Sequence, residues 1–266
     1  MITPVALRST SLVHSQVERL RRNLQTQLAL ADPDPGQIHD IRLCCKKLRS
    51  CIRLLRHKGD ASHWQQADSA LRLVSRQFAP ARDAEVLQHT MHMLHNSTRS
   101  NPCRAACLQV LQALQHSRPA AKVKGKTRPT SKDVPQLLAD TKLTEKAMGK
   151  GMLLTQRRCL RLACKAFEGH TTTESLHRLR RWVKYLGYQF GLAALPTPAN
   201  VKTRQQLAVL GRTLGHIHDL VLLQQQLGAL NLVDRSAAAL VAVQANRLSQ
   251  RLIAQADLAT RALFEI

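Results

Sequence analysis

Aromatic and acidic side chains are both scarce in this chain. Only 3% of its 266 residues are aromatic, with two Trp, two Tyr and four Phe. Proteins that hold single-stranded nucleic acid stack the bases on aromatic rings, so this scarcity argues against such a binding track. The 17 Asp and Glu residues are outnumbered by 40 Lys and Arg residues, which leaves a formal net charge of +23. So large a surplus predicts an anionic partner or surface.

Membrane spans and disulfide patterns are also missing from the sequence. No apolar run approaches the length that crosses a bilayer, so no membrane partner is expected. The seven cysteines are odd in number, form no CxxC pair and fall within helical patterns. We therefore expect reduced cysteines in a cytoplasmic protein without a secretory signal.

Signals for cofactors and metals are weak. The sequence has neither a glycine-rich phosphate loop nor an acidic cluster suited to Mg²⁺, so no cofactor is expected. Glu85, His89 and His92 lie at i, i+4 and i+7 and could form half of a metal site. No further ligand is evident and histidine clusters are common on surfaces, so we expect no metal and no catalytic residues.

The hydrophobic periodicity is helical throughout, which predicts an all-α fold. We expect a single domain over 1–266, built from a first helical bundle (5–117), a flexible basic linker (118–132) and a second helical bundle (133–264). The predicted helices cover 11–31, 39–58, 62–79, 81–95, 103–116, 134–145, 146–168, 173–195, 201–214, 216–230 and 234–264.

A basic stripe runs along the predicted helix that begins near His39. At about 100° per residue, the apolar stripe of this helix contains Ile41, Cys45, Leu48, Ile52 and Leu55. The basic stripe lies roughly 110° from it and contains His39, Arg42, Lys46, Arg49 and Arg53. This position is the shoulder of the core face, whereas a solvated charged face would lie opposite the core. Because like charges at this spacing repel one another, an anionic ligand is expected to offset the repulsion.

The same pattern occurs a second time. His177, Arg180 and Lys184 repeat the spacing of the first three stripe residues, beside a core stripe of Leu179, Val183, Leu186 and Phe190. Each copy is followed by a second matching motif. In it, a basic residue precedes a small residue (Ala79 or Gly215), which precedes a basic residue followed by Asp (Arg82-Asp83 or His218-Asp219). The matching basic residues are Arg76, Arg82, Arg212 and His218. Two motifs recurring in the same order indicate an internal duplication.

These motifs resemble the CHAD family, the conserved-histidine α-helical domain, over nearly the whole chain. The resemblance implies two helical bundles related by a pseudo-twofold axis, with a basic groove or pore between them. It also implies binding of inorganic polyphosphate and association with polyphosphate granules. The implied binding residues are His39, Arg42, Lys46, Arg49, Arg53, His177, Arg180 and Lys184. Arg76, Arg82, Arg212 and His218 are expected in the same groove because their positions match between the two halves.

The chain departs from the family pattern in both copies. Gly187 and Gly191 stand where the first copy has Arg49 and Arg53, which puts the binding strength of the second half in doubt. In the first copy, Ala79-Pro80 replaces the usual Leu-Gly.

The chemistry of the stripe suits a linear polyanion, because cations recur at one-turn spacing of about 5.4 Å along a helix. Arginine makes bidentate contacts with phosphate oxygens, and lysine and protonated histidine add charge. Two alternatives remain. One is an enzyme that processes polyphosphate or phosphate esters through His39 or His177, and the other is a helical nucleic-acid-binding protein. We expect a binding protein and no enzyme. Asp83 and Asp219 are expected to orient the neighbouring basic side chains or to cap a helix turn.

Overall fold

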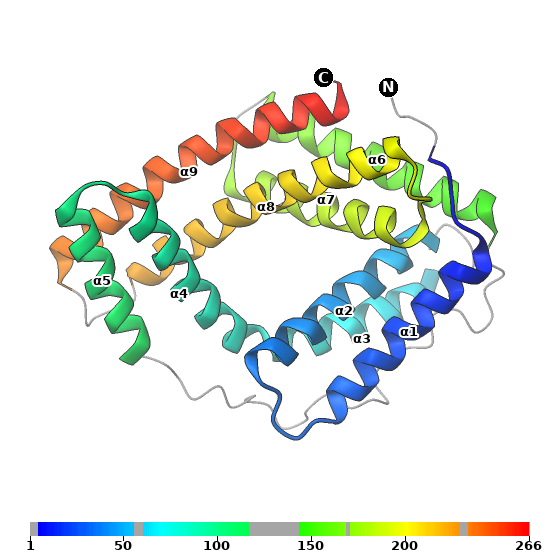
Figure 1. The fold of residues 1–266 in the computed structure, drawn as a ribbon, viewed down its shortest axis with the longest axis horizontal. Helices are drawn as coiled ribbons and strands as arrows, with labels where there is room; N and C mark the ends of the chain where they lie inside the picture. Colours follow the sequence, from blue (N-terminus) through cyan, green and yellow to red (C-terminus); the bar gives the residue numbers. More distant parts are fainter. Residues whose placement is uncertain (1–4, 56–60, 117–143, 169–170, 229–233, 266) are drawn as a thin grey trace.

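The computed structural model describes residues 5–55, 61–116, 144–168, 171–228 and 234–265. Within these ranges every regular element is a helix, which confirms the all-α class (Figure 1). The linker 118–132 and nearly all of the predicted helix over 134–145 lie outside the described residues. The helices are α1 (Thr10–Ala29), α2 (Pro35–Leu55), α3 (Ala61–Gln77), α4 (Ala79–Ser97), α5 (Asn101–His116), α6 (Glu145–Phe167), α7 (Thr173–Ala193), α8 (Pro198–Leu227) and α9 (Arg235–Phe264).

Helices α2 and α7, which carry the two basic stripes, both begin with a reciprocal cap. At the start of α2, the Gln37 amide N–H donates to Asp34 Oδ1 at 2.9 Å, and the Asp34 N–H donates to Gln37 Oε1 at 2.8 Å. At the start of α7, Thr172 and Ser175 exchange the same two bonds, each at 3.1 Å. Such caps satisfy amide groups that the helix cannot, so they fix where each stripe starts.

Helix α8 corrects one prediction from the sequence. The ranges 201–214 and 216–230 were expected to form two helices, but they form one continuous helix that passes through Gly215. A single glycine costs a helix interior about 1 kcal/mol and leaves the hydrogen-bond ladder intact. The matching region of the first copy does break, between α3 and α4, where Pro80 lies in the first turn of the new helix and supplies no N–H.

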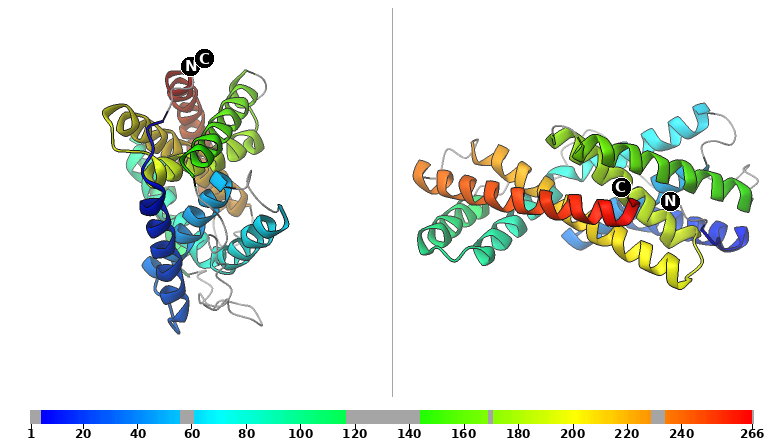
Figure 2. Two further views of the ribbon diagram at one scale, coloured as in Figure 1. Left: turned by 90° about the vertical axis from the view of Figure 1, so that its right-hand side faces the viewer. Right: turned by 90° about the horizontal axis from the view of Figure 1, so that it is seen from above.

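The hydrophobic core is shared between the two sequence halves. One buried cluster joins α1, α2 and α3 to α6, α7 and the first half of α8. A second joins α4 and α5 to the second half of α8 and to α9. Figure 2 shows α9 running along the molecule from the end where α4 and α5 pack. Because each cluster draws on both halves, the halves are packed into one body.

The predicted core stripes are confirmed. All nine of their residues on α2 and α7 are buried, and the basic side chains of α2 from Arg42 to Arg53 are half-buried, as shoulder positions should be. Leu12 of α1 is 43% exposed, because this helix turns Val13 and Val17 toward the core.

Helix α2 lies at the centre of this packing. Buried Gln189 of α7 donates from Nε2 to the Ser50 carbonyl of α2 at 3.1 Å. On another side, a Cβ added to Gly151 of α6 would lie 1.8 Å from the Leu54 carbonyl oxygen, so only glycine permits this approach. In Figure 1, α2 and α7 both run from the middle of the view toward its right-hand side. Their N-terminal ends therefore lie toward the same side of the molecule.

Candidate functional site

Four of the predicted binding residues gather where α7 meets α8. The His177 and His218 rings stack with their centroids 4.8 Å apart and their planes 4° from parallel. Burial, followed by the positive charges of Arg180, His177 and Lys184, lowers the pKa of His218 to about 4. His177 lies at the surface, but partial desolvation and the neighbouring Arg181 and Arg180 lower its pKa as well. At neutral pH the stacked pair is therefore uncharged in the ligand-free protein, beside cations that would favour an anion.

Arg180 is the most deeply placed cation of this group. Its Nε atom is buried without a hydrogen-bond partner in the described structure. Burial lowers its pKa, and the Asp219 carboxylate opposes the shift. An arginine remains charged even so. A Cβ added to Gly215 would lie 3.7 Å from this Nε, so the small residue brings the α8 backbone close to the guanidinium. A buried charged donor without a partner is costly, and an anionic ligand would offset that cost.

A third histidine extends the cluster toward α4. Burial lowers the pKa of His216, which also lies within the electrostatic range of Asp219, His89 and Arg212. Helix α4 packs against α8 here, so His89 brings that helix to the edge of the cluster. The sequence repeat did not reveal His216 or His89, because neither has a counterpart in the motif.

The corresponding residues of the first copy are exposed to the same degree as those of the second, His39 and His177 both lying at the surface, but they make different contacts. Arg42 donates from Nη1 to the Ser75 carbonyl of α3 at 2.7 Å, which ties α2 to α3. Lys46 is half-buried, whereas His39 and Arg76 are exposed. Arg212, in the second copy, is also exposed. The side chain of Arg82 lies outside the description.

Arg49 and Arg53 are engaged inside the protein. Asp68 of α3 accepts from Arg49 Nε at 2.9 Å and from Arg53 Nη1 at 3.0 Å, and exposed Arg72 joins at 2.7 Å. The Arg53 guanidinium also lies over the Tyr185 ring of α7, 4.0 Å from its centroid. Burial alone would raise the pKa of Asp68, but the hydrogen bonds and charges of the two arginines outweigh it and hold the pKa at about 2. These two arginines thus join α2, α3 and α7.

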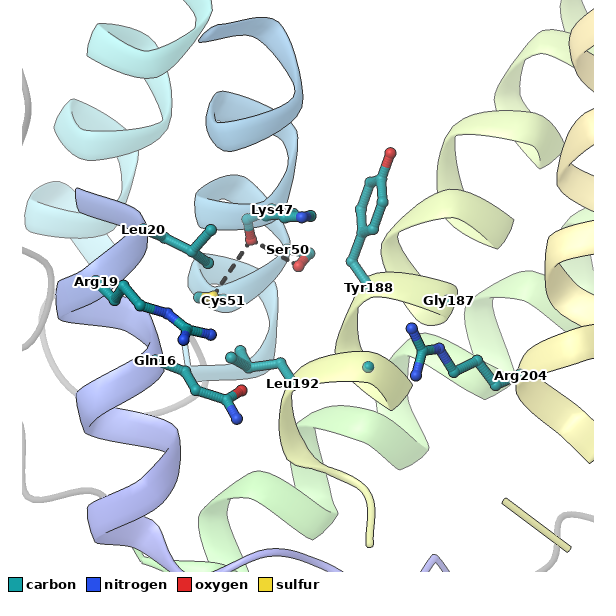
Figure 3. A pocket seen from close by; sticks show the side chains of 11 residues that line it. Gln16, Arg19, Leu20, Lys47, Ser50, Cys51, Gly187, Tyr188, Leu192 and Arg204 are labelled. Carbon is teal, nitrogen blue, oxygen red and sulfur yellow. Dashed lines mark hydrogen bonds between the residues drawn. The ribbon is translucent and has the colours of Figure 1, made fainter. Parts of the chain in front are cut away.

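The second copy holds a cavity in the corresponding place. The alignment that pairs Arg82-Asp83 with His218-Asp219 also pairs Asp68 with Arg204, without a gap. Gly187 and Gly191 replace the two arginines, and a cavity of about 200 Å³ opens beside them between α1, α2, α7 and α8 (Figure 3). Sequence reasoning missed both Asp68 and Arg204. Carrying the repeat through the α3 and α8 segments would have found them.

The sequence was compared with models of known families, and the CHAD domain model matches residues 11–228. The chain belongs to the CHAD family. A solved structure, PptA from Streptomyces chartreusis, superposes on this CHAD protein with a TM-score of 0.69 at 14% sequence identity. The match covers 99% of this chain and 100% of that chain, and it supports the all-α fold. No curated protein matches the sequence. Among the described helices, none combines the length and apolarity needed to cross a membrane.

Proposed function

We propose that this CHAD protein binds inorganic polyphosphate along the N-terminal halves of α2 and α7, and that binding brings it to polyphosphate granules. What supports the proposal most directly is the cluster at the α7–α8 contact. There a half-buried arginine, a lysine and two stacked histidines lie together, and Asp219 lies within electrostatic range of Arg180.

The cluster suits a phosphate chain in charge and in geometry. Arg180 and Lys184 lie one turn apart, which is about 5.4 Å along a helix. A flexible polyanion could bring successive phosphates to the half-buried side chains of Arg180 and Lys184. Counterions released from the polyanion would supply much of the affinity, so binding should weaken steeply with salt.

The first copy contributes from the facing helix. His39, Arg42 and Lys46 occupy the same positions on α2 as His177, Arg180 and Lys184 on α7. Arg49 and Arg53 lie further along α2, where Asp68 already neutralises part of their charge. We therefore assign the main phosphate contacts to the first three positions of each stripe and a lesser part to Arg49 and Arg53.

The experiment is a titration of labelled long-chain polyphosphate into the wild-type protein and two charge-matched variants. Lys184→Glu places a negative charge within the cluster. Arg178→Glu makes the same change in net charge on the same helix, at an exposed residue paired with Glu174. The proposal expects Lys184→Glu to weaken binding at least about tenfold beyond Arg178→Glu, since charge-assisted hydrogen bonds contribute roughly 1.5–3 kcal/mol. Equal losses would place the ligand elsewhere.

Two further measurements separate the alternatives that the sequence left open. Duplex DNA and RNA should displace labelled polyphosphate only at much higher phosphate concentration, and equal competition would favour a nucleic-acid-binding protein. Incubation with polyphosphate and Mg²⁺ should release no orthophosphate. Release that is lost in His39→Gln or His177→Gln would instead identify a processing enzyme.

A further inference from the structure

The cavity beside Gly187 and Gly191 is separate in its lining from the proposed polyphosphate site. It lies between α1, α2, α7 and α8, and none of the twelve residues predicted for polyphosphate binding lines it. Figure 3 shows Arg204 reaching toward α7 from α8, with Lys47 on α2 and Arg19 on α1 at the opposite side of the cavity. Three cations from three helices thus surround one space.

The cavity exists because two side chains of the repeat are missing. In the first copy, Arg49 and Arg53 fill the space between α2 and α3 and bind Asp68. In the second copy the matching residues are Gly187 and Gly191. A Cβ added to Gly191 would lie 3.7 Å from the Arg204 guanidinium, so Arg204 borders the space that an arginine would occupy.

The charge balance is also reversed. Asp68 of the first copy is replaced by Arg204, so an acidic residue that binds two arginines has become a cation facing two glycines. No Asp or Glu is among the residues that line the cavity. At about 200 Å³ the space greatly exceeds the roughly 10–15 Å³ that a single water requires. Ser50 and Tyr188 also line it, and the Ser50 hydroxyl donates to the Lys47 carbonyl at 2.7 Å.

From this juxtaposition we propose that the cavity binds a compact phosphate group, held by Arg19, Lys47 and Arg204. The anion takes the place of the carboxylate that the first copy carries within the protein. Arginine offers paired donors to phosphate oxygens and lysine a point charge, so the three side chains match a dianionic group. The phosphate could come from free orthophosphate or from the end of a polyphosphate chain, because both present the same terminal group.

The test measures binding of two probes, orthophosphate and tripolyphosphate, to the full chain by calorimetry and ³¹P NMR. Arg204→Asp restores the charge of the first copy and should weaken tripolyphosphate binding about tenfold or more. Arg247→Asp, at an exposed residue of α9, makes the same charge change away from the cavity and should have little effect. Gly191→Leu places an apolar side chain in the cavity without changing the charge and should weaken binding by a similar factor. Equal losses in Arg204→Asp and Arg247→Asp, or undisturbed binding in Gly191→Leu, would overturn the proposal.

The two sources of phosphate are distinguished in the same experiment. Orthophosphate binding that depends on Arg204 would identify a free-phosphate site. Binding of tripolyphosphate alone would identify a site for chain ends, and Arg204→Asp should then weaken short chains more than long ones at equal total phosphate. Lys184→Glu should leave tripolyphosphate binding at the cavity intact, so this site and the proposed polyphosphate function can fail independently. Absence of Arg204-dependent binding for both probes would refute the cavity site.

Discussion

The α2–α3 pair and the α7–α8 pair carry the same motif, but they differ in how far its positive charge is neutralised and in whether the space beside it is filled. On α2, Arg49 and Arg53 are bound to Asp68 and Arg53 lies over the Tyr185 ring, so that end of the stripe is closed and part of its positive charge is neutralised. On α7, two glycines face Arg204, and the space is open and basic. In the second helix pair, both arginines and the carboxylate are absent together. Each would be costly alone, because an unpaired buried charge is strongly destabilising.

Loss of the acidic partner in the first pair should have the largest effect on stability. Asp68→Asn leaves Arg53, whose side chain is only 9% exposed, without its counter-charge. We expect the free energy of unfolding to fall by roughly 3 kcal/mol, as for other broken buried ion pairs. Arg204→Gln, at the matching exposed position, should change it by less than about 0.5 kcal/mol. Urea unfolding of both variants checks the difference, and equal destabilisation would remove the contrast between the pairs.

The contribution of Asp68 to the stability of the first pair should also depend on pH. The pKa of Asp68 is about 2 in the folded protein, below its usual 3.8, so its contribution to stability is present above pH 3.8. That contribution, roughly 2 kcal/mol by linkage, is lost as the pH falls from about 4 to about 2. Asp68→Asn should therefore lose this part of the pH dependence in thermal unfolding. A wild-type protein and variant whose stabilities decline in parallel below pH 4 would contradict the assigned pKa.

The glycines of the second pair should be replaceable by alanine. A Cβ at Gly187 or Gly191 would meet its nearest neighbour at 3.8 or 3.7 Å, which is ordinary van der Waals contact. Both residues lie within α7, so each substitution should stabilise the protein by up to about 1 kcal/mol through helix propensity. Gly151→Ala is the opposite control, because its Cβ would collide with the Leu54 carbonyl. Destabilisation by Gly191→Ala would mean that the Arg204 side chain is held more tightly than the contacts indicate.

The smallest expected effect concerns pH and binding. His218 matches Arg82 of the first copy, so only the second copy has a histidine at this position of the repeat. A bound polyanion should raise the His218 pKa from its value of about 4, so the complex takes up a proton and affinity rises as the pH falls from 7 toward 5. His218→Arg should bind a few-fold more tightly at pH 7.5 and flatten this dependence. Titrations of long chains at several pH values test it, and identical profiles would exclude His218 from the site.

Sequence periodicity was sufficient to predict the helices and their buried faces, because a 3.6-residue repeat records which side of a helix is buried. It placed Ile41 and Leu179 in the core and the basic stripe at the shoulder, as the structure has them. It could not predict that Asp68 binds Arg49 and Arg53, since this contact depends on how α2 and α3 pack. It also divided α8 at Gly215, because local signals do not reveal that packing carries a helix through a glycine.

The most direct test of the central claim is the salt dependence of polyphosphate binding. If Lys46 and Lys184 each contact a phosphate, Lys46→Gln with Lys184→Gln should reduce the slope of log affinity against log salt by about 1.4, from roughly 0.7 per contact on a single strand. Arg247→Gln with Arg251→Gln removes the same charge from exposed positions on α9 and should leave the slope nearly unchanged. Equal slopes for the two double variants would mean that the polyanion is held by diffuse surface charge and not by the basic stripes of α2 and α7.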